Sequence, residues 1–493
     1  MEPHTILSKE GYLLNKRNYD EVYLSNIRKE LTVSPMATYK VSAKTKPEKF
    51  IIYDETDDYI SVPKFYGLER FGEPEVNEEL KGKKIKFKTS INLRDYQEEI
   101  VDTTYKQIKE VGGGGICVGC GKGKTIMAIK IIEMVKRKTL IMVHKTFLLD
   151  QWIDRITGVC PDAKIGIIMQ DKIDIEDKDI VIGMLQSIAK DKYDRDVFMD
   201  FGFVVFDEAH HAPSKYFSRA LPIISCRKSL FLTATPKRSD GTEYVLYWYF
   251  GPVAYLLPPD KNDNVIVKSI NYTVEDDKFR EYKVRFTGQV NKAKTITSLG
   301  EVKKRNKFII KLITECLIEE GRKILVLSDR IDHLKRLEKK LKKRDIDYGY
   351  YIGGMKRNKL EESEKKTVIL ASYGMASEGL DIPALNTLIL ATPRRNIEQS
   401  VGRILRKQHK NVQPLIYDIV DNLTSCVNQG EARFKFFRKL DFELYRVKVL
   451  ENEVISEEMI ERKCKKNREK EEVEVDDIEL DMDNLELLYD SDD

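Results

Sequence analysis

The chain has 493 residues, which is too long for a single hydrophobic core and predicts two to four domains. Hydrophobic residues make up 41% of the chain and charged residues 34%, and no apolar run approaches the roughly eighteen residues of a membrane span. This composition excludes an integral membrane protein and predicts a soluble, intracellular one.

The net charge of +4 is unevenly distributed. Residues 471–493 contain twelve Asp and Glu and no Lys or Arg, so residues 1–470 carry +16 once those twelve negative charges are set aside. A basic body with an acidic terminus is typical of a protein that binds a polyanion, and a lysine-rich surface that serves only solubility is the alternative. The odd number of cysteines, seven at irregular spacing, predicts a reducing compartment.

The first half of the chain divides into a polar module and an alternating region. Residues 1–85 are mixed in character, with strand-like runs at 50–53 and 59–62, and we expect a small N-terminal α+β module of unknown role. Residues 86–258 alternate amphipathic stretches with buried-type strands at 139–143, 179–182 and 203–206, a pattern that predicts βαβ units and a parallel sheet. Four consecutive glycines at 112–115 are expected to form a turn before a strand at 116–118.

A candidate phosphate loop follows that strand. Gly121 and Gly123 let backbone N–H groups approach phosphates, Lys124 supplies a charge for the β and γ phosphates, and the Thr125 hydroxyl is a magnesium ligand type. The helix expected at 126–135 would point its N-terminus at the same phosphates. Val118 stands where the strict motif has its first glycine, and a Gly- and Lys-rich surface turn is the alternative interpretation.

An acidic pair follows the strand expected at 203–206. Asp207 and Glu208 should emerge at the carboxyl end of that strand, beside the phosphate loop. ATP hydrolysis needs one carboxylate to hold Mg²⁺ and a second to orient the attacking water. We therefore predict an ATP site in which Asp207 and Thr125 hold the metal and Glu208 activates water. A solvated acidic turn is the alternative.

The second half repeats the alternation. Residues 259–300 are polar and are expected to be a linker or insertion, and strand patterns at 324–327, 368–370, 387–390 and 414–417 predict a second parallel-sheet domain over 301–445. Residues 431–449 alternate aromatic and basic side chains. We expect a helix there that packs on the second domain, with base stacking or phosphate binding as the alternative. Residues 446–493 are predicted to be a charged, acidic tail, which is disordered after Lys470.

Across residues 91–440 the motifs resemble, in order and spacing, those of superfamily 2 helicases of the DEAH type. They stand at residues 93–97 (LRDYQ), 121–125 (GKGKT), 207–210 (DEAH), 233–235 (TAT), 377–381 (SEGLD) and 399–406 (QSVGRILR). The resemblance implies two tandem RecA-like domains that hydrolyse ATP with Mg²⁺ and move on a nucleic acid.

The resemblance also implies roles for individual residues. The nucleotide would be contacted by Gln97, which reads the adenine edge, and by Gly379 and Asp381. The nucleic acid would be contacted by Gln151, Trp152, Gln186, Ser187 and Ser372. Nucleotide state would be coupled to strand contact by His210, Thr233, Thr235 and Gln399.

Arginines of the second domain would complete the ATP site. Positive charge supplied to the transition state accelerates phosphoryl transfer by orders of magnitude. Arg403 and Arg406 are three residues apart, so on a helix they share one face and both can reach the nucleotide. We predict Arg406 as the arginine finger and Arg403 as its partner.

The spelling of the motifs is most similar to helicases directed at double-stranded DNA, and within them to the poxvirus-type transcript-release group of large DNA viruses. The resemblance implies an ATP-dependent DNA helicase or translocase with RNA polymerase or other transcription machinery as a partner. In a virus, the expected location is the host cytoplasm and the virion. The alternatives are an RNA helicase or RNA-stimulated NTPase, and a nucleic-acid-binding scaffold without catalysis. The oligomeric state is not predicted.

Overall fold

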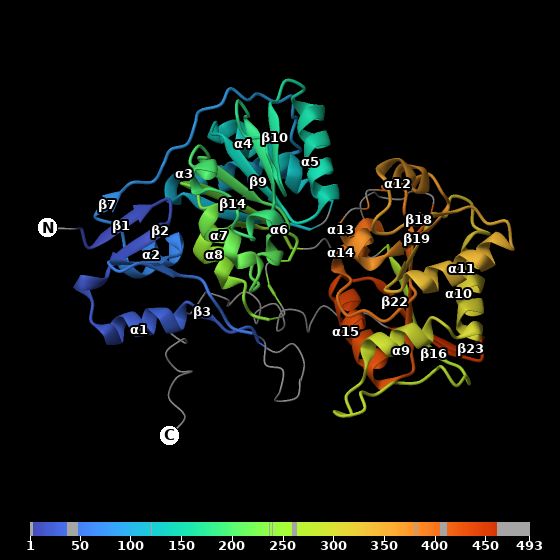
Figure 1. Cartoon of the computed structure of the whole chain (residues 1–493). Helices are drawn as coiled ribbons and strands as arrows, with labels where there is room; N and C mark the ends of the chain where they lie inside the picture. Colours follow the sequence, from blue (N-terminus) through green and yellow to red (C-terminus); the bar gives the residue numbers. More distant parts are fainter. Residues whose placement is uncertain are drawn as a thin grey trace, which may run out of the picture.

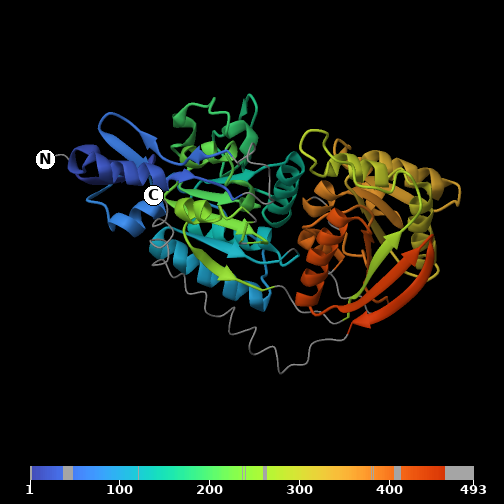
Figure 2. The ribbon, with the colours of Figure 1, turned by 90° about the horizontal axis from the view of Figure 1, so that it is seen from below.

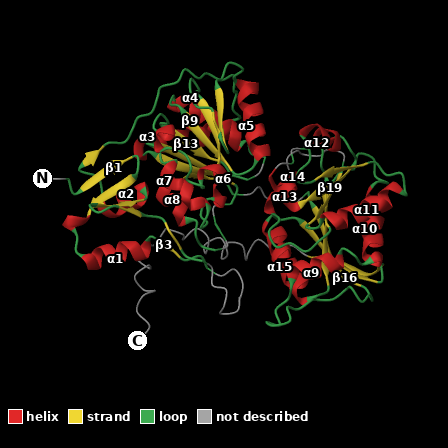
Figure 3. Ribbon diagram, viewed as in Figure 1, coloured by secondary structure: helices red, strands yellow, loops and turns green. Residues whose placement is uncertain are grey.

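The computed structural model describes residues 3–36, 48–119, 121–235, 237–238, 240–258, 264–378, 380, 382–404 and 412–460. Figure 1 shows an N-terminal module, a first α/β domain and a second α/β domain in a row, and Figure 3 shows that a sheet lies at the centre of both α/β domains. Each α/β domain contains an eight-stranded sheet, which confirms the predicted class of two tandem RecA-like domains. No helix in these ranges is both long and apolar enough to cross a membrane.

The first sheet has the order β11-β10-β12-β9-β13-β14-β8-β15, and its pairs are parallel except β10 with β11. Because its strands are parallel, their carboxyl ends meet at one edge, where the phosphate loop and the acidic pair must lie. The strands are β8 (Gly113–Cys117), β9 (Thr139–Val143), β10 (Ile165–Met169), β11 (Lys172–Ile173), β12 (Ile180–Met184), β13 (Phe203–Phe206), β14 (Lys228–Thr233) and β15 (Val253–Leu256).

Helices cover both faces of this sheet. One core packs α3 (Asp95–Val111), α4 (Lys124–Val135) and α5 (Thr146–Val159) on one face. The opposite core packs α6 (Leu185–Ile188), α7 (Ala220–Ile223) and α8 (Tyr244–Phe250), and it continues into the N-terminal module. The central strands are therefore buried on both sides, as their continuous apolar runs predict.

The glycine run belongs to a strand rather than to a turn. Gly113, Gly114 and Gly115 lie inside β8, between β14 and β15. A Cβ on Gly115 would stand 1.9 Å from Cζ of Phe231, and one on Gly113 would stand 2.2 Å from the Phe250 carbonyl oxygen. The glycines are needed because neighbouring side chains and backbone occupy the space of a side chain.

The second sheet has the order β18-β19-β17-β20-β21-β16-β22-β23 and is parallel except for the β22–β23 hairpin. Its strands are β16 (Ile266–Thr273), β17 (Ile324–Ser328), β18 (Tyr348–Tyr351), β19 (Val368–Ser372), β20 (Thr387–Leu390), β21 (Leu415–Asp421), β22 (Glu443–Leu450) and β23 (Glu453–Ile460).

The helices of the second domain also form two layers. Helices α10 (Lys303–Cys316) and α11 (Ile331–Lys342) pack on one face. The opposite face carries α13 (Tyr373–Glu378), α14 (Glu398–Ile404) and α15 (Thr424–Lys439). Figures 1 and 2 show this second group on the side of the domain that faces the first domain. The remaining helices are α9 (Lys292–Leu299) and α12 (Arg357–Glu364).

The structure differs from the predicted boundaries around the second domain. Part of the expected linker, residues 259–300, forms β16 and α9, and β16 lies between β21 and β22 inside the sheet. The expected helix over 431–449 ends at Lys439 and gives way to β22, whose hairpin with β23 occupies the start of the expected tail. Phe434 and Phe437 are buried, which favours their packing role. The charge run after Lys470, which is predicted to be disordered, lies outside the described ranges.

The N-terminal module is built on a five-stranded sheet of order β5-β6-β2-β1-β7. It packs against the first domain through α2 (Lys64–Phe71), whose Tyr66 ring meets the Trp248 ring of α8 edge-on, 5.0 Å between centroids. Lys64 is buried at this contact, with Glu79 at 2.7 Å and the Arg227 carbonyl at 3.0 Å. The other elements are β1 (Thr5–Ser8), β2 (Gly11–Asn15), α1 (Glu21–Glu30), β3 (Thr32–Val33), β4 (Phe50–Ile51), β5 (Asp54–Glu55), β6 (Tyr59–Val62) and β7 (Val76–Asn77).

A buried ion pair joins α10 to the second sheet, and its loss should lower the stability of the second domain. Nε of Arg305 lies 2.6 Å from Oδ1 of Asp421, Nη2 lies 2.9 Å from Oδ2, and both side chains are fully buried. Replacing Arg305 by methionine leaves an unpaired buried carboxylate and should destabilise the second domain by ~3–5 kcal/mol. Urea unfolding measures this loss. Arg305→Met with Asp421→Leu should recover most of it, and a single variant as stable as the parent would contradict the prediction.

Candidate active site

The predicted phosphate loop connects β8 to α4, and Lys124 is the first residue of that helix. Gly121 and Gly123 have positive φ angles of 81° and 83°, in the region that favours glycine. A Cβ on Gly123 would also stand 2.4 Å from Nε2 of Gln97. Since the N-cap residue of α4 is Gly123, which has no side chain to cap the helix, the first N–H groups of α4 are available to phosphate oxygens.

The lysine of the loop is held by the loop itself. Nζ of Lys124 donates to the Val118 carbonyl at 3.0 Å, so a bound nucleotide would have to take over this donor. Val118 is buried in the core, and its N–H donates to the Thr233 carbonyl at 3.2 Å. The position that the strict motif gives to glycine thus continues the sheet here, which explains why a valine is tolerated. Thr125 is half-buried on the first turn of α4.

The acidic pair lies where the sequence predicts, at the carboxyl end of β13. Asp207 follows the strand and is buried, and Oδ1 of its carboxylate accepts the Glu208 N–H at 2.9 Å. Burial, with the nearby Glu208 charge, raises the pKa of Asp207 to about 6, while the Lys124 charge acts in the opposite direction. Lys124 and Asp207 follow the carboxyl ends of two strands of the same sheet, although they are separated by more than eighty residues in sequence.

Glu208 is buried, and one oxygen of its carboxylate has no hydrogen-bond donor among the described residues. Its φ angle is 48°, an uncommon conformation for a non-glycine residue that turns the chain sharply after the strand. Oε2 accepts no hydrogen bond, and Nδ1 of His210 lies 3.4 Å away. A buried carboxylate oxygen without a donor can accept a proton from a water placed beside it.

Three of the residues predicted to couple nucleotide state to strand contact, His210, Thr233 and Thr235, are brought together, whereas Gln399 lies on α14 of the second domain. Nδ1 of His210 lies 3.3 Å from Oγ1 of Thr233, and this hydroxyl donates to the Thr235 carbonyl at 3.0 Å. Burial lowers the pKa of His210 to about 4, so the imidazole is neutral at pH 7. Arg238 is not among the predicted site residues, yet its guanidinium donates to the His210 carbonyl and pairs with Asp240 at 2.6 Å. The sequence signal is an arginine three residues after the TAT motif and two residues before an aspartate.

Gln97 is engaged with the phosphate loop. Its Nε2 donates to the Lys122 carbonyl at 2.9 Å, and its Oε1 accepts the Arg94 N–H at 3.1 Å. The Tyr96 hydroxyl also donates to the Lys122 carbonyl, at 3.2 Å. These bonds tie the start of α3 to the loop, and adenine recognition by Gln97 stays a prediction.

Two residues predicted to contact nucleic acid are buried in this structure. Trp152 is 1% exposed on the inner face of α5, where its indole Nε1 donates to Oδ2 of Asp207 at 2.8 Å. Ser187 is 8% exposed, and its Oγ accepts the Gln170 N–H at 2.9 Å. Their contact with nucleic acid stays a prediction. The spacing of the apolar residues on α5 was the signal that Trp152 belongs to the core.

The other predicted nucleic-acid contacts lie at partly accessible positions. Gln151 is half-buried on α5, and Ser372 is half-buried at the end of β19. Gln186 is half-buried on α6, where its Nε2 donates to the His144 carbonyl and its Oε1 has no hydrogen-bond partner among the described residues. Their contact with nucleic acid stays a prediction.

The second-domain half of the predicted site is described only in part. Gln399 and Arg403 lie on α14, in the helical layer that faces the first domain (Figures 1 and 2). Arg406, Gly379 and Asp381 lie outside the described residues. The two domains touch where Arg357 of α12 pairs with Asp154 of α5.

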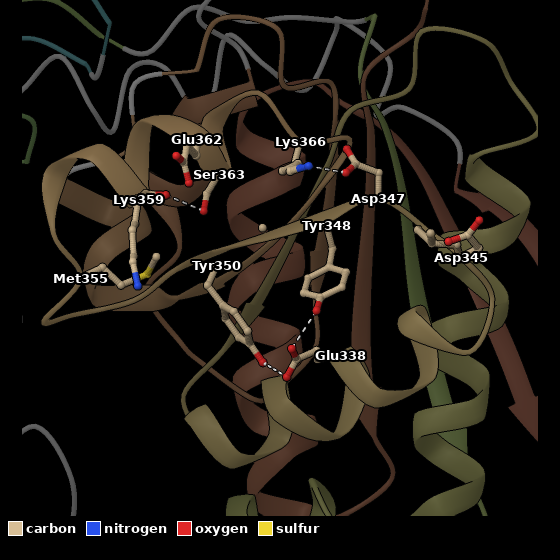
Figure 4. A pocket seen from close by; sticks show the side chains of 12 residues that line it. Glu338, Asp345, Asp347, Tyr348, Tyr350, Met355, Lys359, Glu362, Ser363 and Lys366 are labelled. Carbon is tan, nitrogen blue, oxygen red and sulfur yellow. Dashed lines mark hydrogen bonds and ion pairs between the residues drawn. The ribbon is translucent and has the colours of Figure 1, made fainter.

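A cavity of about 540 Å³ lies away from these residues, at the β18 edge of the second sheet (Figure 4). The hydroxyls of Tyr348 and Tyr350 donate to Glu338 at 2.7 and 2.9 Å, and Nζ of Lys366 lies 2.8 Å from Asp347. These polar groups satisfy one another across the hollow. None of the described residues predicted to bind ATP lines it.

Family models match both α/β domains. The model described as type III restriction enzyme, res subunit, matches residues 90–238, and the model described as helicase conserved C-terminal domain matches residues 304–408. A solved fragment of a provisionally assigned HsdR subunit of a type I restriction enzyme from Vibrio vulnificus has the same fold. Its TM-score is 0.53 at 16% identity, over 75% of this chain and 71% of that chain.

Curated relatives come from large DNA viruses. A protein of Acanthamoeba polyphaga mimivirus with the provisional name ATP-dependent RNA helicase is 38% identical over 461 residues, covering 91% of this chain and 88% of the relative. An African swine fever virus protein with the same provisional name is 27% identical over 391 residues, covering 73% of this chain and 75% of the relative.

The fold and the motif-bearing domains define an ATP-dependent helicase. By its identity to the mimivirus protein over most of both chains, this chain belongs to the superfamily 2 helicases of large DNA viruses.

Proposed function

We propose that the chain uses ATP hydrolysis to move on DNA and to separate or displace what is bound to it. The observation that carries the catalytic part is the meeting of Lys124, Asp207 and Glu208 at one edge of the first sheet. Lys124 would contact the β and γ phosphates, and Glu208, whose Oε2 accepts no hydrogen bond from the described residues, would take the proton of the attacking water.

Magnesium fits the donors at this edge. Mg²⁺ prefers hard oxygen ligands and keeps several of its waters, and the Thr125 hydroxyl and the Asp207 carboxylate are such ligands. When bound, the ion would neutralise charge on the phosphates of ATP. The role of Thr125 and Asp207 is to hold it beside the N-terminus of α4.

The second domain would complete the site when ATP draws the two domains together. We propose Arg403 and Arg406 for the charge of the transition state, and Gly379 and Asp381 for contacts to the nucleotide. Domain closure on ATP and reopening after hydrolysis would move the domains alternately along a strand. Gln151, Gln186 and Ser372 are the proposed contacts to that strand.

DNA is the nucleic acid on which we propose that the enzyme moves, and RNA is the alternative. The family model of the first domain is named after a restriction enzyme subunit, and restriction enzymes act on DNA. The motif spelling also favours DNA-directed helicases. The provisional names of the mimivirus and swine fever virus relatives favour RNA instead. For the DNA enzyme, we propose transcript release or termination with RNA polymerase as partner, in the cytoplasm of an infected cell.

The stimulation of ATP hydrolysis by DNA and by RNA distinguishes the two proposals. ATP hydrolysis is measured with equal nucleotide concentrations of single-stranded DNA, duplex DNA and RNA at one salt concentration, since phosphate contacts make affinity depend on salt. We expect DNA to stimulate hydrolysis several times more than RNA does. Stimulation by RNA alone would overturn the DNA proposal in favour of an RNA helicase. Hydrolysis that no nucleic acid stimulates would contradict coupled movement.

A further inference from the structure

The carboxylate of Asp207 is held by a neutral side chain from another element. Nε1 of Trp152 lies 2.8 Å from Oδ2 of Asp207, and both residues are buried. An indole N–H can only donate, so the direction of this bond is fixed. The other oxygen, Oδ1, accepts the N–H of Glu208 at 2.9 Å. Each oxygen therefore has one donor that fixes it and keeps a lone pair for a further ligand.

Packing alone does not require a tryptophan at this position. The other buried side chains of α5 are aliphatic: Leu148, Leu149 and Ile156. An apolar residue would fill the core here, and of the large apolar side chains only tryptophan brings an N–H donor without a charge or an acceptor. A cationic donor in this place would compete with a metal for the carboxylate, whereas the indole orients it and leaves its charge in place.

Residues that hydrogen-bond to metal-binding carboxylates fix their orientation, and their loss commonly weakens metal binding about 10- to 100-fold. We propose that Trp152 is a positioning residue for the magnesium carboxylate of Asp207. The indole holds the plane of the carboxylate so that its free lone pairs face the phosphate loop. This proposal rests on the proposed role of Asp207 in holding Mg²⁺.

Trp152→Phe is the first test because it keeps an aromatic ring in the core and removes only the donor. The Mg²⁺ concentration that half-activates ATP hydrolysis should rise about 10-fold or more. The KM for ATP at saturating Mg²⁺ should stay within about two-fold, since the indole N–H donates to Asp207 and not to a described residue of the phosphate loop. A purely structural role would lower activity at every Mg²⁺ concentration, and that result would overturn the proposal.

Tryptophan emission supplies a readout that needs neither turnover nor a change at position 152. The chain has two tryptophans, and Trp248 lies at the contact with the N-terminal module, so Trp248→Phe leaves Trp152 as the only tryptophan, which is excited selectively over tyrosine. Adding Mg²⁺ with ADP should change its emission, and ADP with EDTA should not. Emission that ignores Mg²⁺ would overturn the proposal even if Trp152→Phe failed to fold.

The variant Asp207→Asn distinguishes a failure of the proposed role of Trp152 from a failure of the proposed Mg²⁺ site. If that variant binds and requires Mg²⁺ as the parent does, the assignment of Asp207 to the metal is wrong. If Asp207→Asn raises the Mg²⁺ requirement and Trp152→Phe does not, the site stands and the role of Trp152 is wrong. If both raise it, the double variant should be no worse than Asp207→Asn alone, because the indole acts only through that carboxylate.

Discussion

Replacing Lys124 by alanine should reduce ATP hydrolysis by about 10²- to 10³-fold, because one preorganised donor to the reacting charge is worth this much. Lys124 begins α4 and is held at 3.0 Å from the Val118 carbonyl, so its ammonium group is already directed into the loop. The change removes a charge and no core packing. Steady-state phosphate release with and without nucleic acid measures the effect.

A matched control lies on the same helix. Lys130→Ala removes a lysine of α4 that pairs with Glu133 at 2.8 Å, outside the phosphate loop. It should hydrolyse ATP at the parental rate, within about two-fold. Equal losses in the two variants would trace the effect to the fold of α4, and an active Lys124→Ala protein would remove the phosphate loop from the account.

Glu208→Gln should bind ATP and nucleic acid as the parent does and hydrolyse ATP about 10²- to 10⁴-fold more slowly. Glutamine has nearly the same shape but cannot take the proton of the attacking water, and general-base catalysis contributes this range. The fold should tolerate the change because Oε2 of Glu208 accepts no hydrogen bond among the described residues. Nucleotide affinity and single-turnover hydrolysis should be measured on the same protein.

The control for this variant is Glu110→Gln, at an exposed position near the end of α3. It should leave both affinity and rate unchanged. Loss of ATP binding in Glu208→Gln would assign the residue to nucleotide binding rather than to water activation. Retention of full hydrolysis would assign the base to another group.

The part of the site in the first domain could be predicted because its functional residues lie in short, contiguous sequence motifs. A strand, a glycine loop and a helix fix where Lys124 stands, and a buried run ending at Phe206 fixes where Asp207 emerges. Parallel strands bring these ends to one edge whatever their separation in sequence. The local sequence of strand, loop and helix was therefore sufficient to predict where these side chains lie.

Features that depend on distant packing could not be predicted in this way. Gly115 resembles a turn residue, and only the Phe231 ring of the neighbouring strand shows why a strand needs it. The polar β16 was taken for a linker because its partners, β21 and β22, come more than 140 residues later. A local pattern cannot report a partner so far along the chain.

Trp152 shows a third limit. Motif resemblance assigned it to the nucleic-acid surface, while the apolar spacing of Leu148, Leu149, Trp152 and Ile156 pointed to the core. In the structure Trp152 is buried, as the apolar spacing indicates. Its hydrogen bond to Asp207 could not be predicted, because it joins two residues about fifty positions apart in sequence.

The central claim, that ATP hydrolysis drives this chain along DNA, is tested most directly with a labelled DNA fork. The protein, ATP and Mg²⁺ should release the labelled strand, and Glu208→Gln should bind the fork without releasing it. A parallel fork of RNA should stay intact under the same conditions. Release from the RNA fork with the DNA fork left untouched would contradict the account.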